Sequence, residues 1–110
     1  MAYDEDLAQR IRARLAAEDG LTEKAMFGGL AFLLAGNIAV GISGDELMVR
    51  VGPDASGDAL ARPNTRPFDM TGRPMKGWIL VAPDGVDAND ELDAWVARGA
   101  TFARTLPPKG

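Results

Sequence analysis

The sequence contains neither cysteine nor histidine, and these two absences exclude much of the familiar enzyme chemistry. Without histidine there is no imidazole base at neutral pH and no Ser-His or Cys-His nucleophile system. Zinc sites built from nitrogen and sulfur ligands are excluded as well. Neither serine, Ser43 or Ser56, lies in a Gly-x-Ser-x-Gly motif. We therefore expect no catalytic residues, no cofactor and no metal.

Long apolar runs are also missing. The longest, residues 25–35, contains a Gly-Gly pair and is much shorter than the roughly 20 residues that a membrane helix needs. The first residues are acidic, whereas a signal peptide begins with basic ones. We expect a cytoplasmic protein without membrane contact, folded as a single domain over residues 1–110.

Positive charge is scarce overall, because the net charge is −4, but it is locally concentrated. The concentrated stretch contains Arg62, Arg66, Arg73 and Lys76, with Asp69 as the only acid among them. These four cations are candidate contacts for phosphate or an acidic partner, and the neighbouring Trp78 is a candidate platform for a nucleic-acid base. We favour the alternative, an ordinary solvated surface with Trp78 in the core, and we expect both Trp78 and Trp95 to be core residues.

Carboxylates remain as possible metal ligands, and they form two clusters. The clusters are Asp4, Glu5 and Asp6, and Asp87, Asp90, Glu91 and Asp93. Oxygen ligands of this kind hold Mg²⁺ or Ca²⁺. Both clusters lie at the start of expected helices, however, where acids complement the positive end of the helix dipole. No run fits a calcium-binding loop, so we favour the structural interpretation.

The hydrophobic pattern predicts helices and strands in a definite order. The helices cover residues 4–19, 52–62 (a weak pattern) and 87–106, and the strands cover 25–35, 38–43, 46–51, 68–70 and 76–82. This α-β-β-β-α-β-β-α order predicts a two-layer α+β domain with an antiparallel sheet and the long helices on one face. Glycines in a strand or helix allow another element to approach closely. We therefore expect the last helix, at Gly99, to pack on the strand that contains Gly28-Gly29.

Four segments resemble the N-terminal domain of TfoX/Sxy proteins. They are Lys24-Ala-Met-Phe-Gly-Gly-Leu-Ala-Phe, Gly36-Asn37-Ile-Ala-Val-Gly, Arg73-Pro74-Met75-Lys76-Gly77-Trp78 and Leu92-Asp93-Ala94-Trp95-Val96. The resemblance implies a secretion-chaperone-like α+β fold and a link to bacterial competence, in which TfoX acts as a transcriptional coactivator. It also marks a family signature of structural character, formed by Met26, Phe27, Gly28, Gly29, Gly77 and Trp78. TfoX regulators carry a second, C-terminal domain that has no counterpart in these residues.

Three functions follow from these observations. The first is a non-enzymatic interaction module that docks on a transcription-related protein, with a homodimer as a further possibility. The second is direct nucleic-acid binding through the basic stretch, against which the acidic net charge argues. The third, ranked last, is a metal-dependent enzyme that uses carboxylates.

Overall fold

The fold is an open six-stranded sheet with three helices. The computed structural model describes residues 3–26, 29–69 and 74–108. The strands are β1 (Leu21–Met26), β2 (Gly29–Leu34), β3 (Asn37–Ser43), β4 (Glu46–Arg50), β5 (Thr65–Asp69) and β6 (Pro74–Val81). The helices are α1 (Glu5–Leu15), α2 (Ser56–Leu60) and α3 (Asn89–Arg104), with short 3-10 turns η1 (Pro53–Ala55) and η2 (Pro83–Gly85). The predicted α+β class is confirmed.

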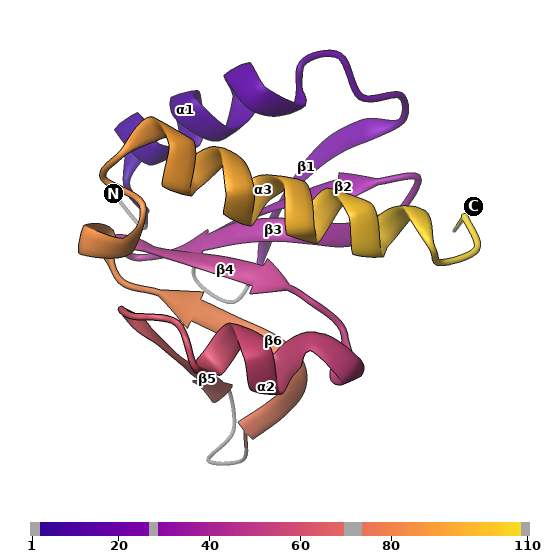
Figure 1. The fold of residues 1–110 in the computed structure, drawn as a ribbon. Coiled ribbons are helices and arrows are strands. Elements are labelled where there is room, and N and C mark those ends of the chain that lie inside the picture. The colour runs from indigo at the N-terminus through magenta and orange to yellow at the C-terminus, as the bar shows by residue number, and fades with distance from the viewer. Residues whose placement is uncertain (1–2, 27–28, 70–73, 109–110) are drawn as a thin grey trace.

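The strand order across the sheet is β1-β2-β3-β4-β6-β5, and every neighbouring pair is antiparallel. The first four strands follow one another in the chain and form a meander (Figure 1). The chain then passes through α2 to the outer strand β5, and β6 returns between β5 and β4. Both edges of the sheet, β1 and β5, lack a partner on one side within the described residues.

The sequence analysis predicted one strand over residues 25–35. The structure has two strands in this region, β1 and β2, so β1 was missed. β1 pairs with β2 in register from Leu21 with Leu34 to Met26 with Gly29. The side chains of residues 22–25 are exposed, so β1 has no apolar alternation to reveal it. Charged side chains such as Glu23 and Lys24 are common on edge strands, where they discourage pairing with other chains.

Other boundaries shift for local reasons. The predicted strand 68–70 begins earlier, at Thr65, and includes Pro67. An edge strand tolerates proline because one row of its backbone groups needs no partner. The first helix ends at Leu15 and not at residue 19. Gly20, at φ 75°, belongs to the approach to β1, where its carbonyl accepts a hydrogen bond of 3.1 Å from the Ala35 backbone.

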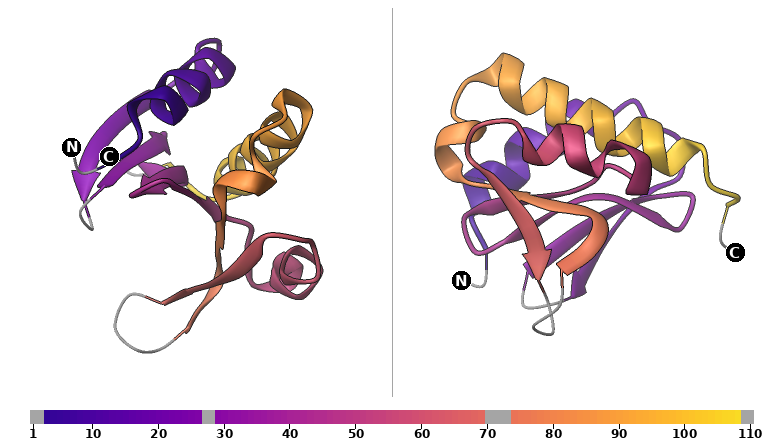
Figure 2. Two further views of the ribbon diagram at one scale, coloured as in Figure 1. Left: turned by 90° about the vertical axis from the view of Figure 1, so that its left-hand side faces the viewer. Right: turned by 60° about the horizontal axis from the view of Figure 1, so that its bottom comes forward.

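The main core lies between the helices and one face of the sheet. All three helices cover this face, as the left view of Figure 2 shows. The sheet contributes Leu30, Phe32, Val40, Ile42, Leu47, Val49, Ile79 and Val81. The helices contribute Leu7, Ile11 and Leu15 of α1, Ala59 of α2, and Leu92, Trp95 and Val96 of α3. The predicted apolar stripes of the two long helices therefore both pack on this core.

Helix α3 crosses the sheet closely at Gly99. A Cβ added at this position would press on the carbonyl oxygen of Ala39 and lie 2.7 Å from Cγ1 of Val40. The close approach expected from the sequence is present, but the partner is β3, because α3 lies over β3 and β4 in the middle of the sheet. The expected contact with Gly28 falls outside the described residues.

Candidate functional site

The second face of the sheet carries a separate apolar cluster. Met48, Phe68 and Leu80 are buried there, and Ile38 and Trp78 are half-buried beside them. Every member comes from a strand. We call these five residues the strand-face cluster. Alternation along each strand explains the separation, because Met48 and Leu80 point away from the core that holds their neighbours Leu47, Val49, Ile79 and Val81.

Trp78 is the aromatic centre of this surface. Its ring centroid lies 6.4 Å from that of Phe68, at a tilt of 38°. The sequence analysis favoured Trp78 as a core residue over a stacking platform. In the structure it is only half-buried, whereas Trp95 is 6% exposed in the main core. One tryptophan is thus a core residue, and the other is partly available at the surface.

Arg50 extends the strand-face cluster toward α3. Its guanidinium carbon lies 4.9 Å from the centroid of the Trp78 ring and 5.4 Å from that of Phe102. Among the described residues, its guanidinium forms neither an ion pair nor a hydrogen bond. Every other arginine that the structure describes has a polar partner. Arg50 is therefore positioned by aromatic rings, and its donors remain available for a ligand.

Sequence reasoning missed Arg50, because it stands alone between apolar residues and outside the basic stretch. A usable signal was present in the alternation of β4. Arg50 shares a face with Met48, and in the register of the sheet it stands opposite Trp78 of β6. That signal required knowledge that β4 and β6 are neighbours, which the chain order alone does not supply.

Gly77 fixes the place of Trp78. The backbone at Gly77 has φ 90°, and its carbonyl accepts hydrogen bonds from the Val51 and Gly52 amides at 2.8 and 3.1 Å. A Cβ at this position would lie 2.9 Å from backbone atoms of Gly52 and Pro53. Only glycine suits such a positive φ and so close an approach. Gly77 therefore has a structural role that positions the residue after it.

The Met-Phe-Gly-Gly element is described at its two ends. Met26 ends β1 and stands in register with Gly29, the first residue of β2. A Cβ on Gly29 would collide with the carbonyl oxygen of Ile42, so this glycine allows β2 and β3 to approach. Phe27 and Gly28, together with the side chain of Met26, lie outside the described residues.

The four basic candidates do not share one environment. Arg62 lies 3.8 Å from Asp58, and Arg66 forms an ion pair with Glu46 across the sheet. The hydrogen bond to Glu46 raises the pKa of Arg66. Lys76 is exposed on β6, and Arg73 lies outside the described residues. Carboxylates thus offset the charge of two of these cations.

The acidic clusters have structural partners. Asp4 caps α1, where its carboxylate accepts hydrogen bonds from the amides of Asp6 and Leu7 at 2.9 and 3.2 Å. Asp93 forms an ion pair with Arg14. No group of three acidic residues in the described part of the chain is arranged to hold a metal ion. These contacts support the structural interpretation of the acidic clusters.

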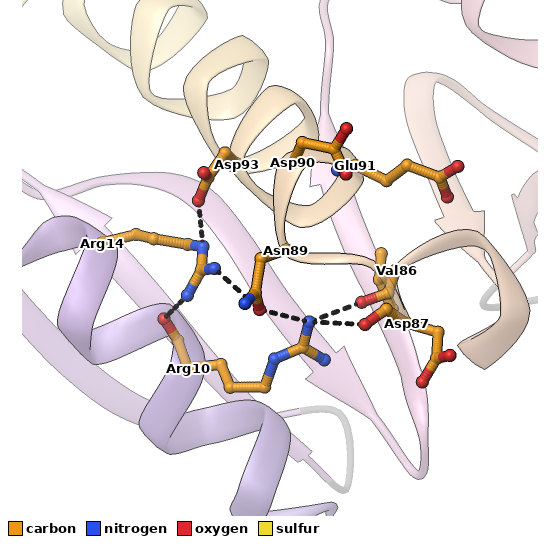
Figure 3. A network of polar contacts seen from close by, with 8 residues as sticks. All are labelled: Arg10, Arg14, Val86, Asp87, Asn89, Asp90, Glu91 and Asp93. Carbon is orange, nitrogen blue, oxygen red and sulfur yellow. Dashed lines mark hydrogen bonds and ion pairs between the residues drawn. The ribbon is translucent and has the colours of Figure 1, made fainter.

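Two arginines of α1 tie this helix to the start of α3 (Figure 3). Arg10 donates hydrogen bonds to the carbonyl oxygens of Val86 and Asp87 at 2.8 and 3.1 Å, and to Oδ1 of Asn89 at 3.2 Å. Arg14 donates to the same Asn89 oxygen at 3.2 Å. The network fixes the two long helices side by side.

The comparisons with known proteins agree with this architecture. The family model of the TfoX N-terminal domain matches residues 13–103, which is most of the chain. The chain belongs to the TfoX N-terminal domain family. Membership indicates a TfoX-like regulatory module. No curated protein and no solved structure matches the chain. Among the described residues, no helix is long and apolar enough to cross a membrane.

Proposed function

We propose that this chain is a non-enzymatic interaction module of the cytoplasm that docks on an acidic segment of a transcription-related protein. The docking surface is the strand-face cluster together with Arg50. The observation that supports this proposal is the half-buried Arg50–Trp78 pair, in which the guanidinium lacks a carboxylate partner among the described residues. Family membership supports the link to transcription and competence.

The chemistry of this pair is that of an interface anchor. Tryptophan and arginine are the residues most enriched among those that dominate binding energy at protein interfaces. A ring contact positions the guanidinium, so little conformational freedom is lost when it binds. Planar guanidinium donors match carboxylates in a two-pronged geometry. An acidic segment with one apolar side chain would fit both Arg50 and the neighbouring Trp78.

Affinity capture with matched variants tests the proposal. The immobilised wild-type protein should recover a transcription regulator or polymerase subunit from native cytoplasm, and Arg50→Gln should recover much less of it. Arg104→Gln is the matched control, because it removes another partly exposed guanidinium that pairs with Glu18 and does not belong to the proposed docking surface. Equal recovery by the Arg50 and Arg104 variants would contradict docking through this face.

Two further measurements separate the alternatives. Nucleic-acid binding through the basic stretch of Arg62, Arg66, Arg73 and Lys76 would show a steep loss of affinity with salt, because each phosphate contact releases counterions. An enzyme would show saturable turnover in a phosphatase, esterase or nuclease screen, abolished by one carboxylate-to-amide change. Either result would replace the docking proposal.

Self-association stays a prediction of its own. The outer edge of β1 presents backbone groups without a strand partner among the described residues, and such edges pair with a second chain unless charge prevents it. Sedimentation of the pure protein decides this point, because a strict monomer at high concentration would leave only a different protein as partner.

A further inference from the structure

A groove lies between α3 and the chain that leaves β4. Its volume is about 400 Å³, within the range of sites that accept small ligands. Its lining residues are Val51 and, from α3 and the residue after it, Ala94, Ala97, Arg98, Thr101, Phe102 and Thr105. Spacings of three and four residues place these α3 side chains on one face of the helix. We call this surface the α3 groove.

Phe102 belongs both to the α3 groove and to the surroundings of Arg50. Its ring lines the groove, and the ring centroid lies 5.4 Å from the guanidinium carbon of Arg50. A Cβ added at Gly52 would lie 2.5 Å from Cε1 of this ring, so Phe102 packs on the backbone two residues after Arg50. The same guanidinium carbon lies 4.9 Å from the centroid of the Trp78 ring. Arg50 therefore lies where the α3 groove meets the strand-face cluster.

The charges at this junction favour an anionic group. Among the described residues, none that lines the α3 groove carries a carboxylate. Arg98 lines it, but its charge is compensated by a hydrogen bond of 2.6 Å to Asp58. Arg50 has neither an ion pair nor a hydrogen bond in the described part of the chain, and its side chain is only half-buried. The uncompensated positive charge therefore lies between two apolar surfaces, and a carboxylate matches guanidinium donors in a two-pronged geometry.

We propose that the partner binds across this junction with a segment that places a carboxylate on Arg50, one apolar side chain beside Trp78 and a second apolar side chain in the α3 groove. This inference rests on the docking function proposed above and adds a second anchor to it. In an extended segment, side chains two residues apart lie on the same side and are roughly 7 Å apart. This spacing is comparable with the distances from Arg50 to its two rings. The segment would therefore have an acidic residue with an apolar residue two positions before it and another two positions after it.

The test uses short peptides as probes and amide NMR shifts of the full chain as the readout. Acetyl-Leu-Ser-Glu-Ser-Leu-amide should give saturable shifts at millimolar concentration, both at residues 97–102 and at residues 78–80. Replacement of its glutamate by glutamine should weaken binding about tenfold, because hydrogen bonds between charged groups are the stronger ones. Replacement of either leucine by serine should weaken binding about fivefold, because less apolar surface is buried.

Variants of the protein separate the two anchors. Arg50→Gln should weaken binding of the glutamate peptide about tenfold and leave binding of the glutamine peptide unchanged. Thr101→Trp fills the α3 groove from an exposed position of the helix, so it should weaken both peptides about fivefold and abolish the shifts in the groove. Ala13→Trp, at an exposed position of α1 that lines neither surface, should bind both peptides normally.

The outcomes distinguish this inference from the docking function. If Arg50→Gln weakens binding and folded Thr101→Trp does not, docking at Arg50 stands and the second anchor is overturned. Equal binding of the glutamate and glutamine peptides to the wild-type protein would contradict both. The absence of saturable shifts at millimolar peptide would overturn the inference, while the affinity capture decides the docking function on its own. Tighter binding of an oligothymidylate at the same residues would overturn it in favour of single-stranded nucleic acid.

Discussion

The two faces of the sheet are made from alternating residues of the same strands, yet they are covered differently. On one face, three helices cover a continuous core that contains Trp95. On the other, the five residues of the strand-face cluster pack without a helix and leave Trp78 half-buried. Stability should therefore depend chiefly on the first face, and recognition on the second. The following predictions test this division, from the largest expected effect to the smallest.

The largest effect should follow from Gly99→Val, where α3 crosses β3. The new side chain would press on the Ala39 carbonyl and on Val40, and backbone cannot yield as a flexible side chain does. We expect a loss of about 4 kcal/mol or more, in the exceptional range for one substitution. Ala97→Val, at an exposed position of the same helix, controls for helix propensity and should cost below ~1 kcal/mol. Urea unfolding of both variants measures this, and similar midpoints would refute the close crossing.

The next prediction compares the two faces directly. Leu47 is fully buried in the main core, so Leu47→Ala should cost about 3 kcal/mol in the free energy of unfolding. Trp78→Ala should cost only about 1.5 kcal/mol, because the ring is half-buried, yet it should reduce partner capture as Arg50→Gln does. If Trp78→Ala destabilises the protein more than Leu47→Ala, the second face belongs to the core.

A smaller effect concerns the ion pair that joins α1 to the edge strand β1. Arg12 and Glu23 lie 2.8 Å apart, with both side chains about one-third exposed. The hydrogen bond from Arg12 lowers the pKa of Glu23. A depressed carboxyl pKa stabilises the fold above its unfolded value of about 4.3 and loses this contribution as pH falls through the folded value. Because solvent screens the pair, Glu23→Gln should cost below ~1 kcal/mol at neutral pH.

The ion pair also predicts the direction in which stability changes with pH. The difference in stability between wild type and Glu23→Gln should be constant near neutral pH and should shrink as pH falls below about 4.3. Thermal unfolding at several pH values, with Glu46→Gln as the comparable substitution on the other face of the sheet, provides the measurement. A difference that grows on acidification would contradict the assigned ion pair.

The mildest substitutions replace one tryptophan at a time by phenylalanine, and tryptophan fluorescence measures their effect. In Trp78→Phe only the buried Trp95 remains, and its emission should be blue-shifted and protected from iodide. In Trp95→Phe the remaining Trp78 should be quenched more readily, because it is half-buried and lies beside Arg50. Equal quenching of the two variants would mean that the faces do not differ in exposure.

The sequence was most informative where one side of an element is buried. The alternation of Leu47, Val49 and Val51 and the stripe of Leu7, Ile11 and Leu15 correctly predicted β4 and α1. The edge strand β1 was missed because its side chains are exposed, and much of β5 was missed because of Pro67. Residue propensity and hydrophobic periodicity reflect how many side chains of an element are buried, and edge strands bury few of theirs.

The candidate sites were less predictable, because they arise from residues distant in the chain. Gly77 and Trp78 were singled out from sequence, but Arg50 acquires meaning only when β4 and β6 are neighbours. Arg98 likewise meets Asp58 only because α2 and α3 cover the same face. The basic stretch, in contrast, is contiguous in sequence, yet Arg62 and Arg66 have different acidic partners. Contiguity along the chain did not translate into a shared surface.

The strand order has a consequence for how the domain assembles. The meander β1-β2-β3-β4 needs only short connections, and such local contacts form quickly. The β5–β6 hairpin joins the sheet through the pairing of β4 with β6, which spans more than twenty residues of chain. It also carries Phe68 and Trp78 to the strand-face cluster. The proposed docking surface is therefore completed only at this non-local step, so a nascent or partly opened chain that already contains the meander would still lack the strand-face cluster.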